Sequence, residues 1–242
     1  GWARALLAAL SWRGLRGWER LVRIRREQLP TTSGGTTARA RAARPDTEPD
    51  APCSFPPVAT WLAVRAQDPE PVVRALRMRT VLPANWRTGL ADVVREGVFA
   101  TPSISGWVLV VGFDLLRATH DSDDLENLLV PLSEEFGEVA WFTTDEAREA
   151  HGWAFAERGE MRRGYRYNSE QGHVYWYGDV MEAERDLECF LDDPRDHSDD
   201  EVKWWPDRQI VLALAAAWSI DPSKLSQLEG GAGRGAGWVG RI

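Results

Sequence analysis

The sequence predicts an α+β fold: a mostly antiparallel sheet, helices packed on one face of it, and an added basic helix at the N-terminus. Hydrophobic residues make up 43% and charged residues 27% of the 242 residues, which is the composition of an ordinary globular protein. The expected elements run strand, helices, strand, helix, several strands and then helices, without strict alternation. Three successive strand patterns within residues 152–177 are joined by turns at Gly159 and around Gly172, which indicates an antiparallel meander.

Residues 1–29 predict an amphipathic, Arg-rich helix that ends at Pro30. Apolar residues recur at helical spacing at Leu15, Trp18 and Val22. Arginines follow another side of the same helix at Arg13, Arg16, Arg20 and Arg23. Such a helix can lie on an anionic membrane surface, or it can dock on the acidic remainder of the chain or on a partner subunit. Residues 30–54 have no apolar period and are rich in Gly, Thr, Arg and Pro, which predicts a flexible linker.

The α+β domain is expected at residues 55–228, with each element placed by its hydrophobic period and its boundary residues. Strands are predicted at 58–66, 107–113, 138–144, 152–158, 161–167 and 173–177. Helices are predicted at about 68–78, 88–96, 124–136, 181–191 and 208–220. Gly137 follows one of these helices at the position where glycine commonly ends a helix. Residues 229–242 form a Gly-rich tail that we expect to be loose.

Charge divides the chain into two parts. Residues 1–45 hold ten Arg and two Glu, a balance of +8, whereas the remainder holds 19 basic and 35 acidic residues, a balance of −16. An acidic body repels phosphate, so nucleic acid is not expected as a partner. The same charge attracts basic surfaces, so we expect a protein partner of basic character. A membrane surface is an alternative partner for residues 1–29.

No sequence motif indicates a cofactor, a metal site or a nucleophilic catalytic residue. Cys53 and Cys189 suggest neither a disulfide framework nor a zinc site, so the expected location is the reducing cytoplasm. No uncharged apolar run reaches the roughly 18 to 20 residues that span a bilayer. Gly235, Gly237 and Gly240 have the spacing of a dinucleotide-binding turn, but we expect no strand before them and no helix after them.

Two similar acidic segments, Thr119–Leu129 and Arg195–Trp205, each combine a histidine, a serine and several carboxylates. In the first, Asp123 and Glu126 have the spacing of a helix N-cap and its N3 partner. In the second, Ser198–Glu201 has the form of a capping box. We interpret both segments as helix starts. A shared metal site and acid/base catalysis are the alternatives.

Aromatic residues are concentrated in the strands predicted between residues 138 and 177, and alternation along a strand cannot place all of them in one core. Exposed aromatic side chains with arginines nearby have the composition of protein-interface hot spots. We therefore expect a partner-binding surface that contains Trp141, Trp153, Tyr165, Tyr167, Tyr175, Trp176, Tyr177 and Arg163. In the alternative arrangement, the outward-facing aromatics lie under the helices or under the N-terminal arm.

From about residue 58 to residue 228, the chain resembles an uncharacterised bacterial α+β domain family. The segments that carry the resemblance are LPANWRTGL (82–90), VFATPSISGWVLVVG (98–112), LSEEFGEVAWF (132–142), GWAFAERGEMRRGYRY (152–167) and AAWSIDPSKL (216–225). These segments fit buried strands, a hairpin and a capped terminal helix. The resemblance therefore implies a fold and attaches no activity, cofactor or site residue. Small acidic α+β proteins of this kind are similar to immunity proteins that neutralise bacterial toxins.

These observations favour a non-enzymatic, cytoplasmic protein-binding domain of immunity or accessory-factor type. One alternative is a hydrolase-like enzyme with an unrecognised carboxylate and histidine site, in which His120 or His197 would meet two carboxylates. The other alternative is a peripheral membrane protein that is held by the helix at residues 1–29.

Overall fold

The computed structural model describes residues 45–93, 96–190, 205–229 and 231–242. The predicted N-terminal helix at residues 1–29 lies outside the described residues. So do residues 30–44 of the predicted linker and most of the second acidic segment.

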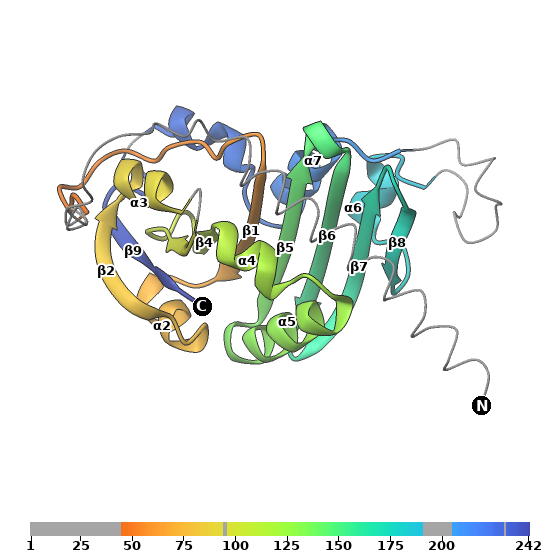
Figure 1. Ribbon diagram of the computed structural model, residues 1–242, viewed down its shortest axis with the longest axis horizontal. Coiled ribbons are helices and arrows are strands. Elements are labelled where there is room, and N and C mark those ends of the chain that lie inside the picture. The colour runs from red at the N-terminus through yellow and green to blue at the C-terminus, as the bar shows by residue number, and fades with distance from the viewer. Residues whose placement is uncertain (1–44, 94–95, 191–204, 230) are drawn as a thin grey trace, which may run out of the picture. The chain divides into compact units, whose positions relative to one another are not determined.

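In the described part of the chain, nine strands form one sheet, and each pair of neighbouring strands is antiparallel. Their order across the sheet is β2-β9-β3-β4-β1-β5-β6-β7-β8 (Figure 1). The strands are β1 (Ala59–Arg65), β2 (Arg79–Asn85), β3 (Val98–Ala100), β4 (Trp107–Val111), β5 (Glu138–Asp145), β6 (Ala150–Glu157), β7 (Glu160–Asn168), β8 (Gly172–Tyr177) and β9 (Ala236–Arg241). The predicted α+β class with an antiparallel sheet is confirmed.

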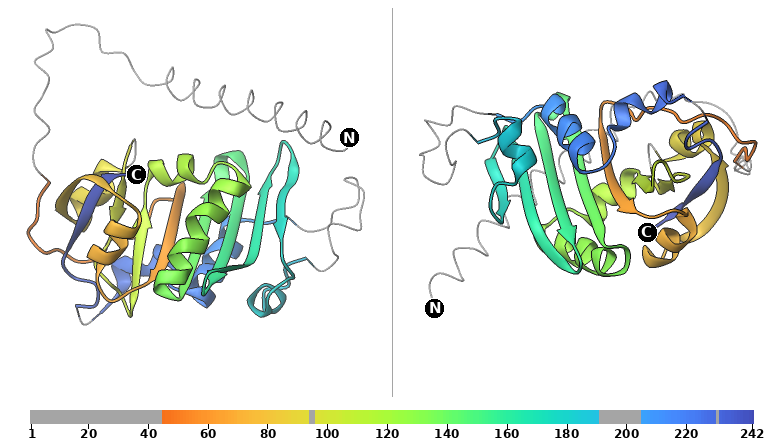
Figure 2. Two further views of the ribbon diagram at one scale, coloured as in Figure 1. Left: turned by 90° about the horizontal axis from the view of Figure 1, so that it is seen from below. Right: turned by 180° about the vertical axis from the view of Figure 1, so that it is seen from behind.

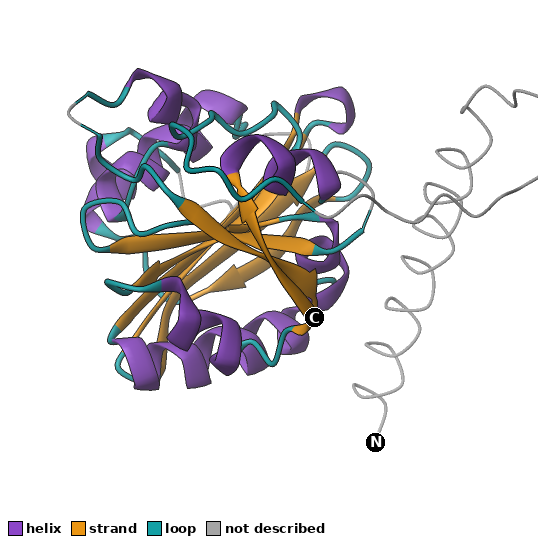
Figure 3. Cartoon of the chain, turned by 90° about the vertical axis from the view of Figure 1, so that its left-hand side faces the viewer, coloured by secondary structure: helices purple, strands orange, loops and turns teal. Residues whose placement is uncertain are grey.

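Helices lie on both faces of this sheet, as Figure 3 shows. The described helices are α2 (Pro69–Ala75), α3 (Trp86–Asp92), α4 (Phe113–Ala118), α5 (Ser122–Phe136), α6 (Glu182–Asp186) and α7 (Arg208–Trp218), with short 3-10 helices η1 (Glu146–Arg148) and η3 (Pro222–Gln227). Side chains of α2, α4 and α5 belong to one apolar cluster, and those of α6, α7 and η3 belong to another. Figure 2 shows α5 and α7 on opposite sides of the sheet. The prediction that helices cover one face only is therefore wrong.

Each face of the sheet buries its own apolar cluster, because successive side chains of a strand point to opposite faces. In β1, Trp61 and Ala63 belong to the cluster that contains α7, whereas Leu62 and Val64 belong to the cluster that contains α5. We call these two sides the α7 face and the α5 face. All residues of β4 are buried, as expected for a strand covered on both sides. The continuous apolar runs of the central strands therefore require two helical layers.

The C-terminal tail supplies an inner strand of the sheet. β9 pairs with β2 on one side and with β3 on the other. A Cβ atom at Gly237 would lie 2.1 Å from the carbonyl oxygen of Ala100, so glycine permits the close approach of β9 to β3. Near the end of β9, Arg241 Nε donates a hydrogen bond to Asp114 Oδ2 at 2.7 Å. The expectation of a loose tail is therefore wrong for β9, because the backbone of this strand is paired on both sides.

Residues 45–54, which were expected to belong to the linker, are hydrogen-bonded to the rest of the domain. The backbone N–H of Asn85 donates to the carbonyl oxygen of Asp46 at 2.7 Å. Asp50 Oδ1 accepts a hydrogen bond from the N–H of Trp86 at 2.8 Å, and Asp50 also forms a β-bridge with Gly235. The compact domain consequently begins before residue 55.

Candidate functional site

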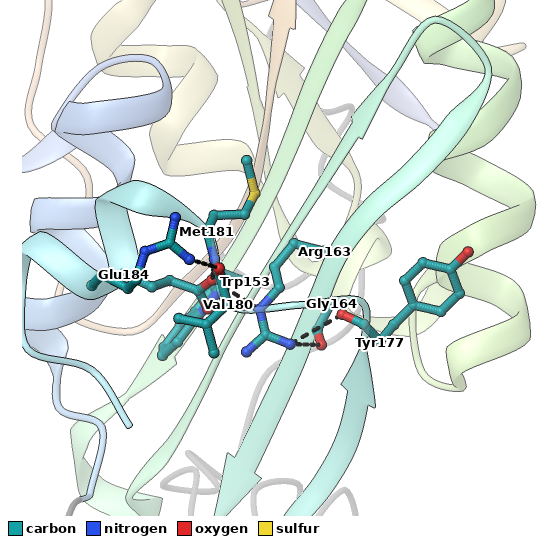
Figure 4. Close-up of polar contacts among 8 residues, drawn as sticks. Trp153, Arg163, Gly164, Tyr177, Val180, Met181 and Glu184 are labelled. Atoms are coloured by element: carbon teal, nitrogen blue, oxygen red, sulfur yellow. Dashed lines mark hydrogen bonds and ion pairs between the residues drawn. The ribbon is translucent and has the colours of Figure 1, made fainter. Parts of the chain in front are cut away.

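Arg163 on β7 and Glu184 on α6 form a fully buried ion pair, shown in Figure 4. Arg163 Nε donates to Glu184 Oε1 at 2.7 Å and to Oε2 at 2.9 Å, and both side chains have 0% exposure. Arg163 Nη1 also donates to the carbonyl oxygens of Gly164 and Tyr177, at 3.2 and 3.0 Å. One guanidinium group therefore ties β7 to α6 and to the end of β8.

The Glu184 carboxylate accepts two further hydrogen bonds (Figure 4). Trp153 Nε1 donates to Oε1 at 2.8 Å, and the backbone N–H of Met181 donates to Oε2 at 2.7 Å. The second bond satisfies a backbone donor at the start of α6. Glu184 was not among the predicted site residues, because a single acid in an acidic sequence gives no sign that it will be buried.

Aromatic rings surround this ion pair on the α7 face. Trp153 and Tyr165 lie 4.6 Å apart by ring centroid, and Tyr165 and Phe190 lie 4.7 Å apart. Arg163 Cζ lies 4.1 Å from the ring centroid of Trp176. A buried cation between aromatic faces is favourable because the ring faces are electronegative. The cluster is therefore a packed core that positions α6.

A second polar cluster lies on the α5 face. Arg166 Cζ lies 4.5 Å from the ring centroid of Trp141, and its Nη1 and Nη2 donate to the carbonyl oxygens of His120 and Thr119 at 2.7 and 2.5 Å. Burial lowers the pKa of Arg166 to about 10. Next to it, the hydroxyl of Tyr175 donates to Glu126 Oε1 at 3.0 Å. These contacts hold the first turns of α5 over β7 and β8.

The predicted partner-binding residues are mostly core residues. Five of the eight are buried, with exposures of 8% or less: Trp141, Trp153, Arg163, Tyr165 and Tyr167. Tyr175 and Trp176 are partly buried against the two clusters, and Tyr177 is 39% exposed. This burial corrects the expectation of an exposed aromatic surface. Alternation places the aromatic side chains on two faces of the sheet, but helices cover both faces. Most of these side chains therefore lie under helices, which was the alternative arrangement.

Strand β8 is one edge of the described sheet, and β7 is its only described strand neighbour. Its sequence, Gly172–Tyr177, contains no charged residue and no proline. The pairing with β7 shifts between Arg166 and Tyr167, which leaves Val174 as the extra residue of a bulge. Val174 is 44% exposed and Tyr177 is 39% exposed. β8 therefore presents apolar side chains at a sheet edge that has no further strand among the described residues.

Strand β2, the opposite edge, is interrupted at several points. Pro83 has no N–H to donate, and Thr80 has a positive φ of 55°. The pairing of β2 with β9 shifts between Arg79 and Leu82. Proline and irregular pairing are the features with which proteins protect an exposed strand edge. Of the two edges, only β8 lacks a proline.

Carboxylates flank β8. On the α5 face, Asp121, Asp123 and Asp124 are exposed at the start of α5, and Glu126 contacts Tyr175. Beyond β8 in the chain, Asp179 and the α6 region contribute further acidic residues at Glu182, Asp186 and Glu188. Arg185 is the one basic residue between positions 179 and 188, so acidic residues predominate near β8 and favour a positively charged partner.

The first acidic segment is a helix start, although its N-cap differs from the predicted one. Asp121 is the N-cap residue of α5, two positions before Asp123, and its side chain makes no capping hydrogen bond. Glu126 instead accepts the hydrogen bond from Tyr175. The described residues contain no group of three or more His, Cys, Asp or Glu side chains placed to hold a metal ion. Ser198–Glu201 lies outside the described residues.

The described histidines occupy three separate places. His151 Nδ1 is hydrogen-bonded to Thr144 Oγ1 at 3.0 Å, and burial lowers its pKa, opposed by nearby carboxylates of which Asp207 is the strongest. His173 Nδ1 lies 2.6 Å from the hydroxyl of Tyr165. His120 Nε2 lies 3.9 Å from Asp121 Oδ1. His197 lies outside the described residues. Of the two histidines that were expected to meet two carboxylates, His120 is therefore the one that the structure describes.

Two further observations bear on the candidate functions. Among the described residues, no helix is long and apolar enough to cross a membrane. The predicted membrane-surface helix at residues 1–29 lies outside this part of the chain. No family model, curated protein or solved structure matches the chain.

Proposed function

We propose that the chain is a non-enzymatic, cytoplasmic protein-binding domain of immunity or accessory-factor type, and that it holds its partner at the β8 edge of the sheet. One observation carries this proposal. β8 has a described strand neighbour on one side only, contains neither charge nor proline, and exposes Val174 and Tyr177. An extended segment of a partner can pair with such an edge and bury both side chains.

The contrast between the two sheet edges supports the proposal. Exposed strand edges promote aggregation, so proteins commonly interrupt or charge them. β2 carries Pro83 and an irregular register, whereas β8 has only the bulge at Val174. An edge strand that pairs with a partner segment would account for this difference. The cytoplasmic location is supported by Cys53 and Cys189, which form no disulfide.

The test uses substitutions of matched exposure on the two edges. Val174→Lys places a charge on β8, and Leu82→Lys places the same charge on β2, where Leu82 is 40% exposed. The tagged full-length chain is used to recover partners from a lysate of its native host. The complex is then examined by hydrogen exchange, with residues 172–177 as the region of interest.

We expect a stoichiometric protein partner that protects the β8 amides from exchange, since strand pairing converts solvent-exposed N–H groups into hydrogen-bonded ones. Val174→Lys should reduce recovery of this partner at an unchanged melting temperature, and Leu82→Lys should leave recovery unchanged. The proposal fails if no stoichiometric partner is recovered, or if a recovered partner leaves β8 unprotected and tolerates both substitutions equally.

A further inference from the structure

We infer that the segment received by β8 is an extended basic strand, with Lys or Arg at every second position facing the start of α5 and apolar residues at the positions between them. This inference rests on the proposed function and adds the chemistry of the partner. It follows from where the carboxylates lie relative to the edge.

Strand geometry fixes where the side chains of an added strand would point. A strand paired with β8 would lie about 4.8 Å beyond it, with alternate side chains on the two faces of the sheet. The contact between Tyr175 and Glu126 places the first turns of α5 on the α5 face directly beside β8. Every second residue of the added strand would therefore face these turns.

The start of α5 carries only negative charge. Asp123 and Glu126 are one helical turn apart and thus lie on the same side of the helix. No Lys or Arg occurs from residue 118 to residue 147. Arg166 lies nearby, but both its Nη atoms donate to the carbonyl oxygens of Thr119 and His120. A Lys or Arg on a bound strand would supply the opposite charge.

On the α7 face, Trp205 offers apolar contact to the residues that lie between the basic ones. Trp205 is 53% exposed, and its ring centroid lies 5.5 Å from that of Tyr167, which pairs with His173 at the start of β8. An exposed tryptophan held against a buried tyrosine is a side chain of the type that dominates binding interfaces. Apolar residues on this side of the added strand would bury Trp205.

Charge also opposes a second copy of the chain as the occupant. Two copies joined through their β8 strands would bring the acidic start of α5 in each copy close to the same pair of strands. Carboxylates that are brought close together repel one another, which opposes this pairing. A basic extended segment would instead place positive charges beside the acidic start of α5.

The test measures the binding of short fluorescent peptides to the full-length chain by anisotropy. The probe is an eight-residue peptide of alternating Arg and Val. Three controls match its length: alternating Glu and Val, a block peptide of four Arg followed by four Val, and the alternating Arg-Val peptide with N-methyl groups on alternate amides. The block peptide keeps the charge of the probe but loses its alternation. The N-methylated peptide keeps the charge and the alternation but loses backbone hydrogen-bond donors.

We expect the alternating Arg-Val peptide to bind more tightly than all three controls. The pair of substitutions Asp123→Asn and Glu126→Gln should weaken its binding about three- to tenfold, since two exposed charge pairs are lost. Gln at position 126 keeps an oxygen that can accept from Tyr175. Glu134→Gln with Glu135→Gln, which removes the same charge at the other end of α5, should leave binding unchanged.

Several results would overturn the inference. Equal binding of the block or N-methylated peptide would mean that charge alone is recognised, without strand pairing. Equal weakening by the substitutions at positions 134 and 135 would mean that no position on α5 is specific. If a host partner protects β8 while these peptide preferences are absent, the proposed function stands and the basic strand is wrong. If the peptide binds as expected but no host partner exists, the proposed function fails instead.

Discussion

Arg163 Nε lies 2.7 Å from Glu184 Oε1, and neither side chain has any exposed surface. The two residues are separated by 21 positions in sequence and join the sheet to α6. Removing one member of such a pair leaves the other charge buried without compensation, which is far more costly than losing a pair at the surface.

Glu184→Gln should therefore lower the free energy of unfolding by about 3–5 kcal/mol, measured by chemical denaturation. The double variant Arg163→Met with Glu184→Gln should be more stable than Glu184→Gln alone, because no unpaired charge remains in the core. As a matched control on the same strand, Arg162→Met should cost less than about 1 kcal/mol, since its ion pair with Glu160 is exposed to solvent. Additive effects of the two core substitutions would contradict the pairing.

Gly237→Ala should lower the melting temperature by several degrees, because the new Cβ would lie 2.1 Å from the carbonyl oxygen of Ala100 and force β9 away from β3. Ala236→Ser is the control, since that neighbouring residue of β9 already has a Cβ atom. Calorimetry of both variants makes the comparison. A tolerated alanine at position 237 would show that β9 is not held between β2 and β3.

Stability should fall as the pH is lowered through the range below about 6.5, and His151 should contribute to the fall. Burial lowers the pKa of folded His151, so the unfolded chain binds a proton first as the pH drops. The stabilising contribution is therefore complete above the unfolded pKa and is lost as the pH falls toward the folded pKa. His151→Asn should flatten the pH dependence of the unfolding free energy between pH 7 and 5. His120→Asn, at a more exposed histidine, serves as the comparison, and an identical slope in wild type and His151→Asn would refute the assignment.

Arg166→Lys should destabilise the protein by about 2 kcal/mol, although the charge is kept. The planar guanidinium donates to two carbonyl oxygens at once while it lies over Trp141, and an ammonium group cannot reproduce this geometry. Arg162→Lys on the same strand should be nearly neutral, because that side chain is 44% exposed. Urea denaturation of the two variants decides the matter, and equal midpoints would argue against the bridging role of Arg166.

Much of the sheet could be predicted because its signals are local. The meander of β6, β7 and β8 was predicted from strand patterns separated by turns, and the structure has those three strands in sequence with antiparallel pairing. The end of α5 at Gly137 was also predicted, since a glycine with positive φ suits that position. Such signals need only neighbouring residues.

Other elements gave no local signal. β3 has three residues, β2 contains Pro83, and β9 lies in a Gly-rich tail, so each reads as loop in a sequence pattern. β2 and β3 form strands because β9 pairs with both of them, and this pairing joins residues more than 130 positions apart. The sequence pattern puts the start of α5 two residues late, because several neighbouring carboxylates have almost equal capping propensity.

The candidate site shows the same limit. Sequence by itself determined the alternation within each strand, which puts Trp153 and Phe155 on one face of β6 and Tyr165 and Tyr167 on one face of β7, together with the negative charge of the domain. The register of the sheet then brought Trp153 and Tyr165 to one face and Trp141 to the other. Only the tertiary structure decided which of these side chains are exposed, because exposure depends on helices that come from distant parts of the chain. Alternation assigns a side chain to a face, whereas the packing of α5, α6 and α7 decides that both faces are covered and leaves Val174 and Tyr177 of β8 exposed.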